Sequence, residues 1–333
     1  MNDGNATRDP DQANVSERLR LFVIAQVPPE LQQALAVDNE LVPCLMEGTE
    51  PGQWPALQAS CTAVLTRAVF GVPAALLARL PNLQLVVSLG AGVEKIDQRE
   101  LARHGITLVH TPDELTEDVA DYVVGMIYAT QRKIVAADRF VRSGAWRAGR
   151  FGYSRRVSSR RVGLVGMGRI GTRIAAKLAA LGMTISYYNR STRSDLPYAQ
   201  LATVVALAQA VDILVVACAG TRETQHLVNA DVLRALGPEG VVINIARGSI
   251  IDESALIEAL SANTIAAAAL DVFESEPNPD PRLLELTNAV LSPHAASLTV
   301  ESKQAMHSRL VQGVRDYVGR NGASASLSDL PIV

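Results

Sequence analysis

The sequence is poor in the residue types that mark several classes of protein. Its 333 residues include three cysteines and 4% aromatic residues, and the formal net charge is only −3. This balance argues against nucleic acid as a partner, because phosphate-binding surfaces usually carry a basic excess. Cys44, Cys61 and Cys218 lie far apart, without paired or metal-ligand spacing. We therefore expect free thiols in a reducing compartment, and no bound metal.

Long apolar runs are also lacking. Segment 1–17 is polar and contains acidic residues, so it does not resemble a secretory signal, and we expect a disordered tail. The most apolar stretch, 201–220, is interrupted by Gln209 and Asp212 and is unsuited to span a bilayer. The sequence predicts a soluble, cytoplasmic protein that binds no membrane, and its length suggests about two domains.

Short apolar runs alternate with Ala/Leu-rich segments in the first third of the chain. The runs at 19–27, 62–67, 83–90 and 106–112 predict strands, and segment 73–80 predicts a helix. Strands that alternate with helices favour a parallel sheet with helical crossovers. The sequence therefore predicts an α/β fold.

A long helix over 116–135 is predicted to begin a second unit, with Thr116 as a cap and Glu117 and Asp118 in an acidic first turn. A last periodic helix is predicted over 301–320. Six strands, mostly separated by helical segments, are expected between these helices: 162–166, 184–189, 212–218, 241–246, 267–272 and 289–293. That count is typical of a doubly wound dinucleotide-binding sheet.

A glycine fingerprint follows the first of these six strands. Gly166, Gly168 and Gly171 have the spacing G-x-G-x-x-G, between a strand and an amphipathic helix. The first glycine permits a tight turn, the second lets the backbone approach a pyrophosphate, and the third allows close helix packing. We expect this turn, with Arg169 and Ile170, to bind a dinucleotide at the helix N-terminus.

The end of the next strand indicates which dinucleotide is bound. NAD enzymes usually place an acid there, about 20 residues on, to bind the ribose 2′-hydroxyl. This chain instead has Asn189, Arg190, Ser191 and Arg193. Guanidinium groups suit phosphate oxygens, so we expect the cofactor to be NADP, with NADPH preferred over NADH. The alternative is that both arginines are solvated charges on a loop.

Three chemically distinct residues follow three successive strands. Arg247, Glu276 and His294 leave the predicted strands at their carboxyl ends, where open parallel sheets bind ligands. Hydride transfer to a 2-oxo acid leaves negative charge on the carbonyl oxygen, so a proton donor is needed. Imidazolium can supply that proton, a carboxylate can orient the ring, and a guanidinium can hold the substrate carboxylate. We expect the three side chains to converge.

These segments carry a family resemblance. Residues 243–260, 268–277 and 291–297 (INIARGSIIDESALIEAL, AALDVFESEP and LSPHAAS) are similar to the D-isomer-specific 2-hydroxyacid dehydrogenases. The resemblance covers about 60–320 and is most specific between 160 and 300.

The resemblance implies roles for particular residues. The family's catalytic arginine, glutamate and histidine match Arg247, Glu276 and His294, of which the arginine and histidine also contact substrate. Its cofactor contacts match Thr116 and Asp271. We also expect contacts from Thr224 and from Cys218, although many family members carry proline in the region of Cys218. Its substrate-carboxylate loop, which binds through backbone N–H groups, matches Leu89, Gly90, Ala91 and Gly92. Family members are usually homodimers.

The resemblance also implies two discontinuous Rossmann-like domains. After the tail at 1–17, residues 18–117 would form the first part of a flavodoxin-like substrate domain, and 118–298 a doubly wound cofactor domain. Residues 299–333 would return to the substrate domain.

Within the family, segment 189–193 (NRSTR) and loop 90–92 (GAG) look most like those of the glyoxylate/hydroxypyruvate reductases and the 2-ketogluconate reductases. We therefore expect an NADPH-preferring reductase of glyoxylate and hydroxypyruvate, with His294 as general acid. A dehydrogenase for 2-ketogluconate, phenylpyruvate or another D-2-hydroxy acid is the first alternative, and Trp146 is a candidate lining residue of the pocket. A nucleotide-sensing interaction protein on the same fold is the second.

Overall fold

The computed structural model describes residues 18–54 and 61–321 and divides them into two compact units. One unit contains the described residues up to Pro112 and from Gln304 onward, and the other is Asp113–Lys303. The predicted tail at 1–17 lies outside the described residues. Both units are α/β structures with parallel sheets, as predicted.

The first unit contains a five-stranded sheet in the order β2-β1-β3-β4-β5, with every neighbouring pair parallel. This is the flavodoxin-like order that was predicted. The strands are β1 (Arg20–Val23), β2 (Glu40–Pro43), β3 (Ala63–Arg67), β4 (Leu85–Leu89) and β5 (Thr107–His110). The edge strand β2 was missed because it is short, half-exposed and ends in proline.

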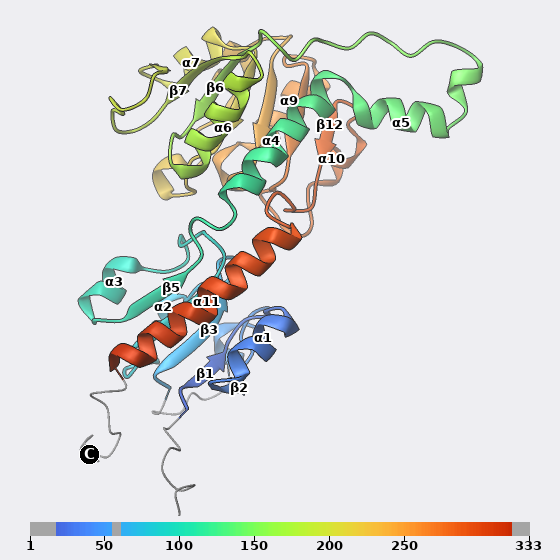
Figure 1. Cartoon of the computed structure of the whole chain (residues 1–333). Helices are drawn as coiled ribbons and strands as arrows, with labels where there is room; N and C mark the ends of the chain where they lie inside the picture. Colours follow the sequence, from blue (N-terminus) through green and yellow to red (C-terminus); the bar gives the residue numbers. More distant parts are fainter. Residues whose placement is uncertain (1–17, 55–60, 322–333) are drawn as a thin grey trace, which may run out of the picture. The chain divides into compact units, whose positions relative to one another are not determined.

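Helices cover both faces of this sheet (Figure 1). One face packs on α1 (Pro29–Ala36) and α11 (Val300–Asn321), and the other on α2 (Ala74–Leu77) and α3 (Gln98–Arg103). A short 3₁₀ turn, η2, spans Pro51–Gln53. The C-terminal helix thus completes the core of a unit that begins near the N-terminus.

The second unit contains seven parallel strands in the order β12-β11-β10-β9-β6-β7-β8. All six predicted strands are present, and β8 adds a short edge. The strands are β6 (Arg161–Val165), β7 (Thr184–Tyr188), β8 (Ala199–Gln200), β9 (Ile213–Val216), β10 (Val241–Asn244), β11 (Ala267–Leu270) and β12 (Ala289–Leu291). The direction of winding reverses between β6 and β9, which is where doubly wound folds bind dinucleotides.

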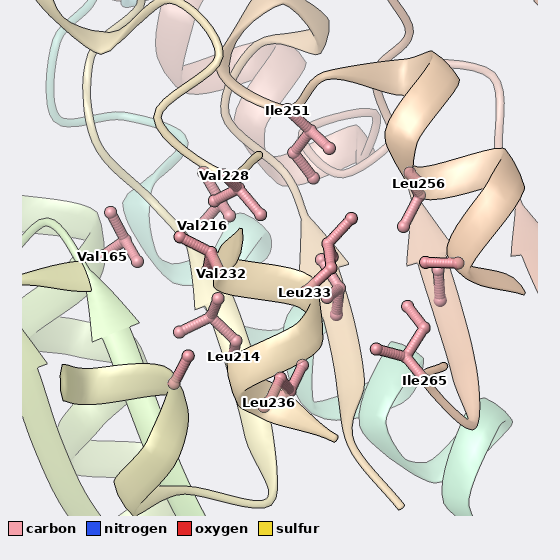
Figure 2. Packing of buried hydrophobic residues seen from close by; sticks show 14 of the residues in the cluster. Val165, Leu214, Val216, Val228, Val232, Leu233, Leu236, Ile251, Leu256 and Ile265 are labelled. Atoms are coloured by element: carbon pink, nitrogen blue, oxygen red, sulfur yellow. The ribbon is translucent and has the colours of Figure 1, made fainter. Parts of the chain in front are cut away.

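The crossover helices bury their apolar sides on this sheet, and Figure 2 shows Val232, Leu233 and Leu236 packed beside Leu214 and Val216. The α-helices are α4 (Thr116–Gln131), α5 (Ile134–Arg142), α6 (Arg169–Ala180), α7 (Val204–Ala210), α8 (Ala230–Leu236), α9 (Glu253–Ser261) and α10 (Pro281–Glu285). The 3₁₀ turns are η3 (Ala145–Arg147), η4 (Arg222–Thr224) and η5 (Gly248–Ile250). No helix in the described part of the chain is long and apolar enough to cross a membrane.

The predicted helix over 116–135 was wrong in two respects. It breaks at Lys133, whose φ of 53° is left-handed, so α4 and α5 are separate helices. Thr116 is the first helical residue rather than the cap, which is Leu115, and no side chain caps this end. The acidic first turn is instead used in ion pairs, in which Glu117 meets Arg173 and Lys177 of α6.

Candidate active site

The glycine fingerprint forms the turn between β6 and α6. Gly166 has a φ of 102°, and a Cβ atom there would lie 2.7 Å from the backbone of Cys218. A Cβ on Gly171 would lie 2.2 Å from the carbonyl oxygen of Gly166, so glycine is required at both positions. Gly168 instead faces open space, where a Cβ would contact nothing within 4 Å. The turn is thus packed against backbone at Gly166 and Gly171 and open at Gly168. The open side fits a pyrophosphate at the helix N-terminus.

The other expected cofactor contacts in this unit differ in their surroundings. The Oγ1 atom of Thr116 is buried and has no hydrogen-bond partner among the described residues. The thiol of Cys218 packs behind the turn, and burial raises its pKa to about 11. Thr224 closes its own turn: its hydroxyl donates to the carbonyl oxygen of Ala219 at 2.8 Å and accepts from the Thr221 amide at 2.8 Å.

The chain leaves β7 beside the glycine turn. Asn189 accepts a long hydrogen bond from the Met167 amide (3.4 Å) and donates to the Ser191 carbonyl oxygen (2.9 Å). The first residue after the strand, Asn189, carries an amide and not a carboxylate. A cavity of about 410 Å³ opens there, lined by Tyr188, Asn189, Arg190, Gln200, Leu201 and Ala202.

His294 and Glu276 form a hydrogen-bonded pair at the carboxyl ends of β12 and β11. The Nδ1 atom of His294 lies 2.8 Å from Oε2 of Glu276, and the Phe273 amide donates to Oε1 at 3.0 Å. Burial alone would raise the pKa of the Glu276 carboxyl. The two hydrogen bonds, with the charges of His294 and Arg247, outweigh burial and bring that pKa below its ordinary value. The pair therefore favours an ionised carboxylate that orients the ring through Nδ1.

Arg247 is brought to this pair by the close approach of two loops. A Cβ on Gly248 would lie 1.9 Å from the carbonyl carbon of Phe273, so the loop after β10 runs directly against the loop after β11. The stem of Arg247 passes Gly220, where a Cβ would meet its Cγ at 2.7 Å. The pairing of Glu276 with His294 is thus present, and the charge of Arg247 contributes to the lowered pKa of Glu276. That all three side chains act on one substrate stays a prediction.

The carboxylate of Asp271 has a structural role that was not predicted from the sequence. Its side chain is 1% exposed and accepts hydrogen bonds from the amides of Ala295 (2.7 Å) and Ala296 (2.9 Å) and from the Ser292 hydroxyl. These contacts surround His294, whose φ is 53°. The signal for this role in the sequence was an acidic residue directly after an apolar strand. The carboxylate holds the loop that presents the histidine.

An apolar cavity of about 330 Å³ adjoins the pair. Leucine, proline and phenylalanine side chains form most of its wall, and the lining residues are Phe273, Glu276, Pro277, Pro279, Leu284, Leu291, Ser292, Pro293 and His294. Trp146 is not among them and is 66% exposed.

The expected carboxylate-binding loop belongs to the first unit. Leu89 ends β4, and Gly90 turns the chain with a φ of 115°. The Gly90 amide donates to the buried hydroxyl of Thr111 at 3.0 Å, a support that the sequence did not indicate. The loop then continues through Ala91 to Gly92.

The doubly wound sheet, the glycine turn and the histidine–carboxylate pair define a dehydrogenase that uses a nicotinamide dinucleotide. Residues 124–296 match the model of the D-isomer specific 2-hydroxyacid dehydrogenase, NAD binding domain. The chain belongs to the D-isomer specific 2-hydroxyacid dehydrogenase family, as the sequence analysis predicted.

Individual relatives extend this result. The chain is 47% identical to glyoxylate/hydroxypyruvate reductase A of Arabidopsis thaliana, over 74% of this chain and 79% of the relative. It is 38% identical to 2-ketogluconate reductase of Gluconobacter oxydans, over 74% and 80%. The solved structure of the NADPH-dependent glyoxylate/hydroxypyruvate reductase of Sinorhizobium meliloti, in complex with NADP and malonate, superposes with a TM-score of 0.83. It is 39% identical and covers 90% of this chain and 93% of that chain.

Proposed function

We propose that this enzyme reduces small 2-oxo acids with NADPH, converting glyoxylate to glycolate and hydroxypyruvate to D-glycerate. The observation that carries the proposal is the His294–Glu276 pair, 2.8 Å apart, in the unit that holds the glycine turn. Relatives named as glyoxylate/hydroxypyruvate reductases support this choice of substrates.

Each of the three residues has a separate role in the reduction. A bound nicotinamide dinucleotide would supply the hydride for this reduction. His294 donates a proton to the carbonyl oxygen as negative charge develops there, and Glu276 holds and orients the ring. Arg247 anchors the substrate carboxylate with its guanidinium fork. The first unit is the proposed substrate domain, in which the backbone amides of Ala91 and Gly92 would bind a carboxylate.

The residues around the glycine turn fit the cofactor. Its pyrophosphate would be held by the turn and the first residues of α6, namely Gly166, Gly168, Arg169, Ile170 and Gly171. Its other contacts would be Thr116, Cys218, Thr224 and Asp271. Asn189 in place of an acid, with Arg190 on the neighbouring cavity, favours a 2′-phosphate over a 2′-hydroxyl.

A substrate panel tests the proposal. The ratio kcat/KM is measured for glyoxylate, hydroxypyruvate, 2-ketogluconate and 4-hydroxyphenylpyruvate with NADPH and with NADH. We expect the two small acids with NADPH to give the highest values. Highest values for another acid would contradict the proposed substrates, and higher values with NADH would contradict the proposed cofactor preference. Nucleotide binding without turnover of any acid would revive the interaction-protein alternative.

The apolar cavity favours a second candidate substrate class. Phe273, Leu284 and Leu291 line it beside His294, and such a surface suits an aromatic 2-oxo acid. The chain is also 44% identical to hydroxyphenylpyruvate reductase of Plectranthus scutellarioides, over 78% of this chain and 83% of the relative. A kcat/KM for 4-hydroxyphenylpyruvate above that for hydroxypyruvate would favour this candidate.

We also infer a cytoplasmic homodimer. The segment of α5 and η3 exposes Ile134, Val141 and Trp146 to solvent, and Tyr153 beyond it is 99% exposed. Several large apolar side chains on one exposed segment suit contact with a second copy of the chain. Light scattering after size-exclusion chromatography should give twice the monomer mass, and Trp146→Glu should lower it.

A further inference from the structure

The two arginines that follow β7 make different contacts. Arg190 is exposed and lines the cavity of about 410 Å³ at the strand end. Arg193 does not line that cavity. Its Nε and Nη2 atoms donate to the carboxylate of Asp195 at 2.8 and 2.7 Å, and its Nη1 donates to the carbonyl oxygen of Met167 at 2.7 Å. Its guanidinium thus joins the loop after β7 to the glycine turn.

Met167 lies between the first two glycines of the fingerprint, so its peptide groups set the shape of the turn. Its amide donates to Oδ1 of Asn189 at 3.4 Å. Its carbonyl oxygen accepts the short bond from Arg193 and a long one, 3.4 Å, from the Thr172 hydroxyl. The contact from Arg193 is the shortest of these and the only one from a charged donor, and charge-assisted hydrogen bonds are about twice as strong as neutral ones.

The loop that carries Arg193 is itself anchored. The hydroxyl of the buried Tyr187 donates to the backbone carbonyl oxygen of Arg193 at 3.1 Å. The carboxylate of Asp195 accepts two parallel hydrogen bonds, from Nε and Nη2 of Arg193, and these bonds fix the plane of the guanidinium group. The hydrogen bonds from Arg193 bring the pKa of Asp195 to about 2, so its carboxylate stays charged at any pH used for assay. A guanidinium already paired in this way attracts a further anion less than an unpaired one.

We propose that Arg193 is a positioning residue that holds the glycine turn in its binding shape for either nucleotide, whereas Arg190 recognises the 2′-phosphate. The proposal rests on the proposed function, because it requires a nicotinamide dinucleotide on the turn. It differs from the sequence-based expectation, in which both arginines contact the phosphate. The hydrogen bond from Thr221 contributes most to the lowered pKa of Glu223. The charge of Arg190 also contributes, so the two side chains lie near each other.

The test measures the Kd of NADPH and of NADH separately, by titration of the nucleotide fluorescence. Arg190→Ala should weaken NADPH by about tenfold or more, which corresponds to about 1.4 kcal/mol, and leave NADH unchanged. Arg193→Ala should weaken both nucleotides by the same factor. Arg234→Ala serves as the matched control, because it removes an exposed arginine paired with Asp231 on α8. Selective weakening of NADPH by Arg193→Ala would overturn the proposal.

Two further variants separate positioning from direct phosphate binding. Arg193→Lys keeps one donor for Met167 and should recover part of the affinity for both nucleotides. Asp195→Asn removes the charged partner of Arg193 and should weaken both nucleotides slightly. A selective gain for NADPH in Asp195→Asn would mean that Asp195 withholds Arg193 from the phosphate, and would overturn the proposal.

The test also separates this inference from the proposed function. If the wild-type enzyme binds NADH more tightly than NADPH, the proposed preference fails, but the NADH affinity of Arg193→Ala still decides the positioning role. An unchanged NADH affinity in that variant, with unchanged circular dichroism and Tm, would overturn the inference alone.

Discussion

The backbone amide of His294 donates a hydrogen bond to the carbonyl oxygen of Asp271 at 2.8 Å. The Asp271 side chain then accepts from the two amides that follow His294 and from the Ser292 hydroxyl. One residue at the end of β11 therefore holds the loop after β12 on both sides of the histidine. This arrangement explains how His294 keeps a left-handed φ, which is unfavourable for a residue with a Cβ.

His294→Ala should lower kcat for glyoxylate by roughly 10² to 10⁴, the usual contribution of general acid–base catalysis. The Kd of NADPH should stay unchanged, because His294 lies outside the glycine turn. His104→Ala is a suitable control, since His104 is half-exposed on the first unit and pairs with Glu100. Retention of full turnover in His294→Ala would show that another group delivers the proton.

Asp271→Asn should lower both kcat and stability. The carboxamide has one acceptor oxygen and presents N–H groups where the carboxylate faced donors, so at least one buried donor loses its partner. An unsatisfied buried group costs about 1–3 kcal/mol. Ser292→Ala removes only one donor and should cost about 1 kcal/mol. Denaturant unfolding compares the two variants, and equal losses would contradict the central position of Asp271.

Gly248→Ala should disrupt the approach of Arg247 to Glu276. The added methyl group would overlap the peptide between Phe273 and Glu274, with a distance of 2.0 Å to the Phe273 carbonyl oxygen. Overpacking of this kind costs typically about 1–3 kcal/mol, and here it also displaces the loop that carries Arg247. We expect a lower Tm together with a higher KM for glyoxylate. Gly149→Ala, where a Cβ would contact nothing within 4 Å, should change neither quantity.

The elements that the sequence predicted share one physical origin. Apolar runs mark the buried strands, and the carboxyl ends of parallel strands lie at one edge of a sheet. Arg247, Glu276 and His294 could therefore be placed together from their positions after strands. The glycine turn could be recognised because its spacing follows from steric requirements at Gly166 and Gly171.

The features that were missed depend on contacts that no local pattern records. The break at Lys133 requires a left-handed conformation at a residue type that rarely adopts it. The Asp271 carboxylate accepts hydrogen bonds from amides that lie 24 and 25 residues later in the sequence. The contact between Arg193 and Met167 spans 26 residues and depends on a single side-chain conformation. Composition and spacing carry no information on such pairs.

Glu276→Gln tests the charge on the histidine–carboxylate pair through its pH dependence. The pKa of the Glu276 carboxyl is lower in the folded chain than its ordinary value of 4.5. A carboxyl group with a lowered pKa stabilises the fold above the unfolded pKa, and this stabilisation is lost as pH falls through the folded pKa. The wild type should therefore have a higher Tm than Glu276→Gln at pH 7, and the difference should shrink as the pH falls below 4.5.

The control for this experiment is Glu301→Gln, which changes an exposed carboxyl group in the first turn of α11. Its Tm difference from the wild type should be small at pH 7, because exposed charges near helix ends contribute only about 0.3–1 kcal/mol. A Tm difference for Glu276→Gln that grows on acidification would reverse the predicted sign. It would mean that the folded state favours the protonated carboxyl, and Glu276 could then not serve as the anionic partner of His294.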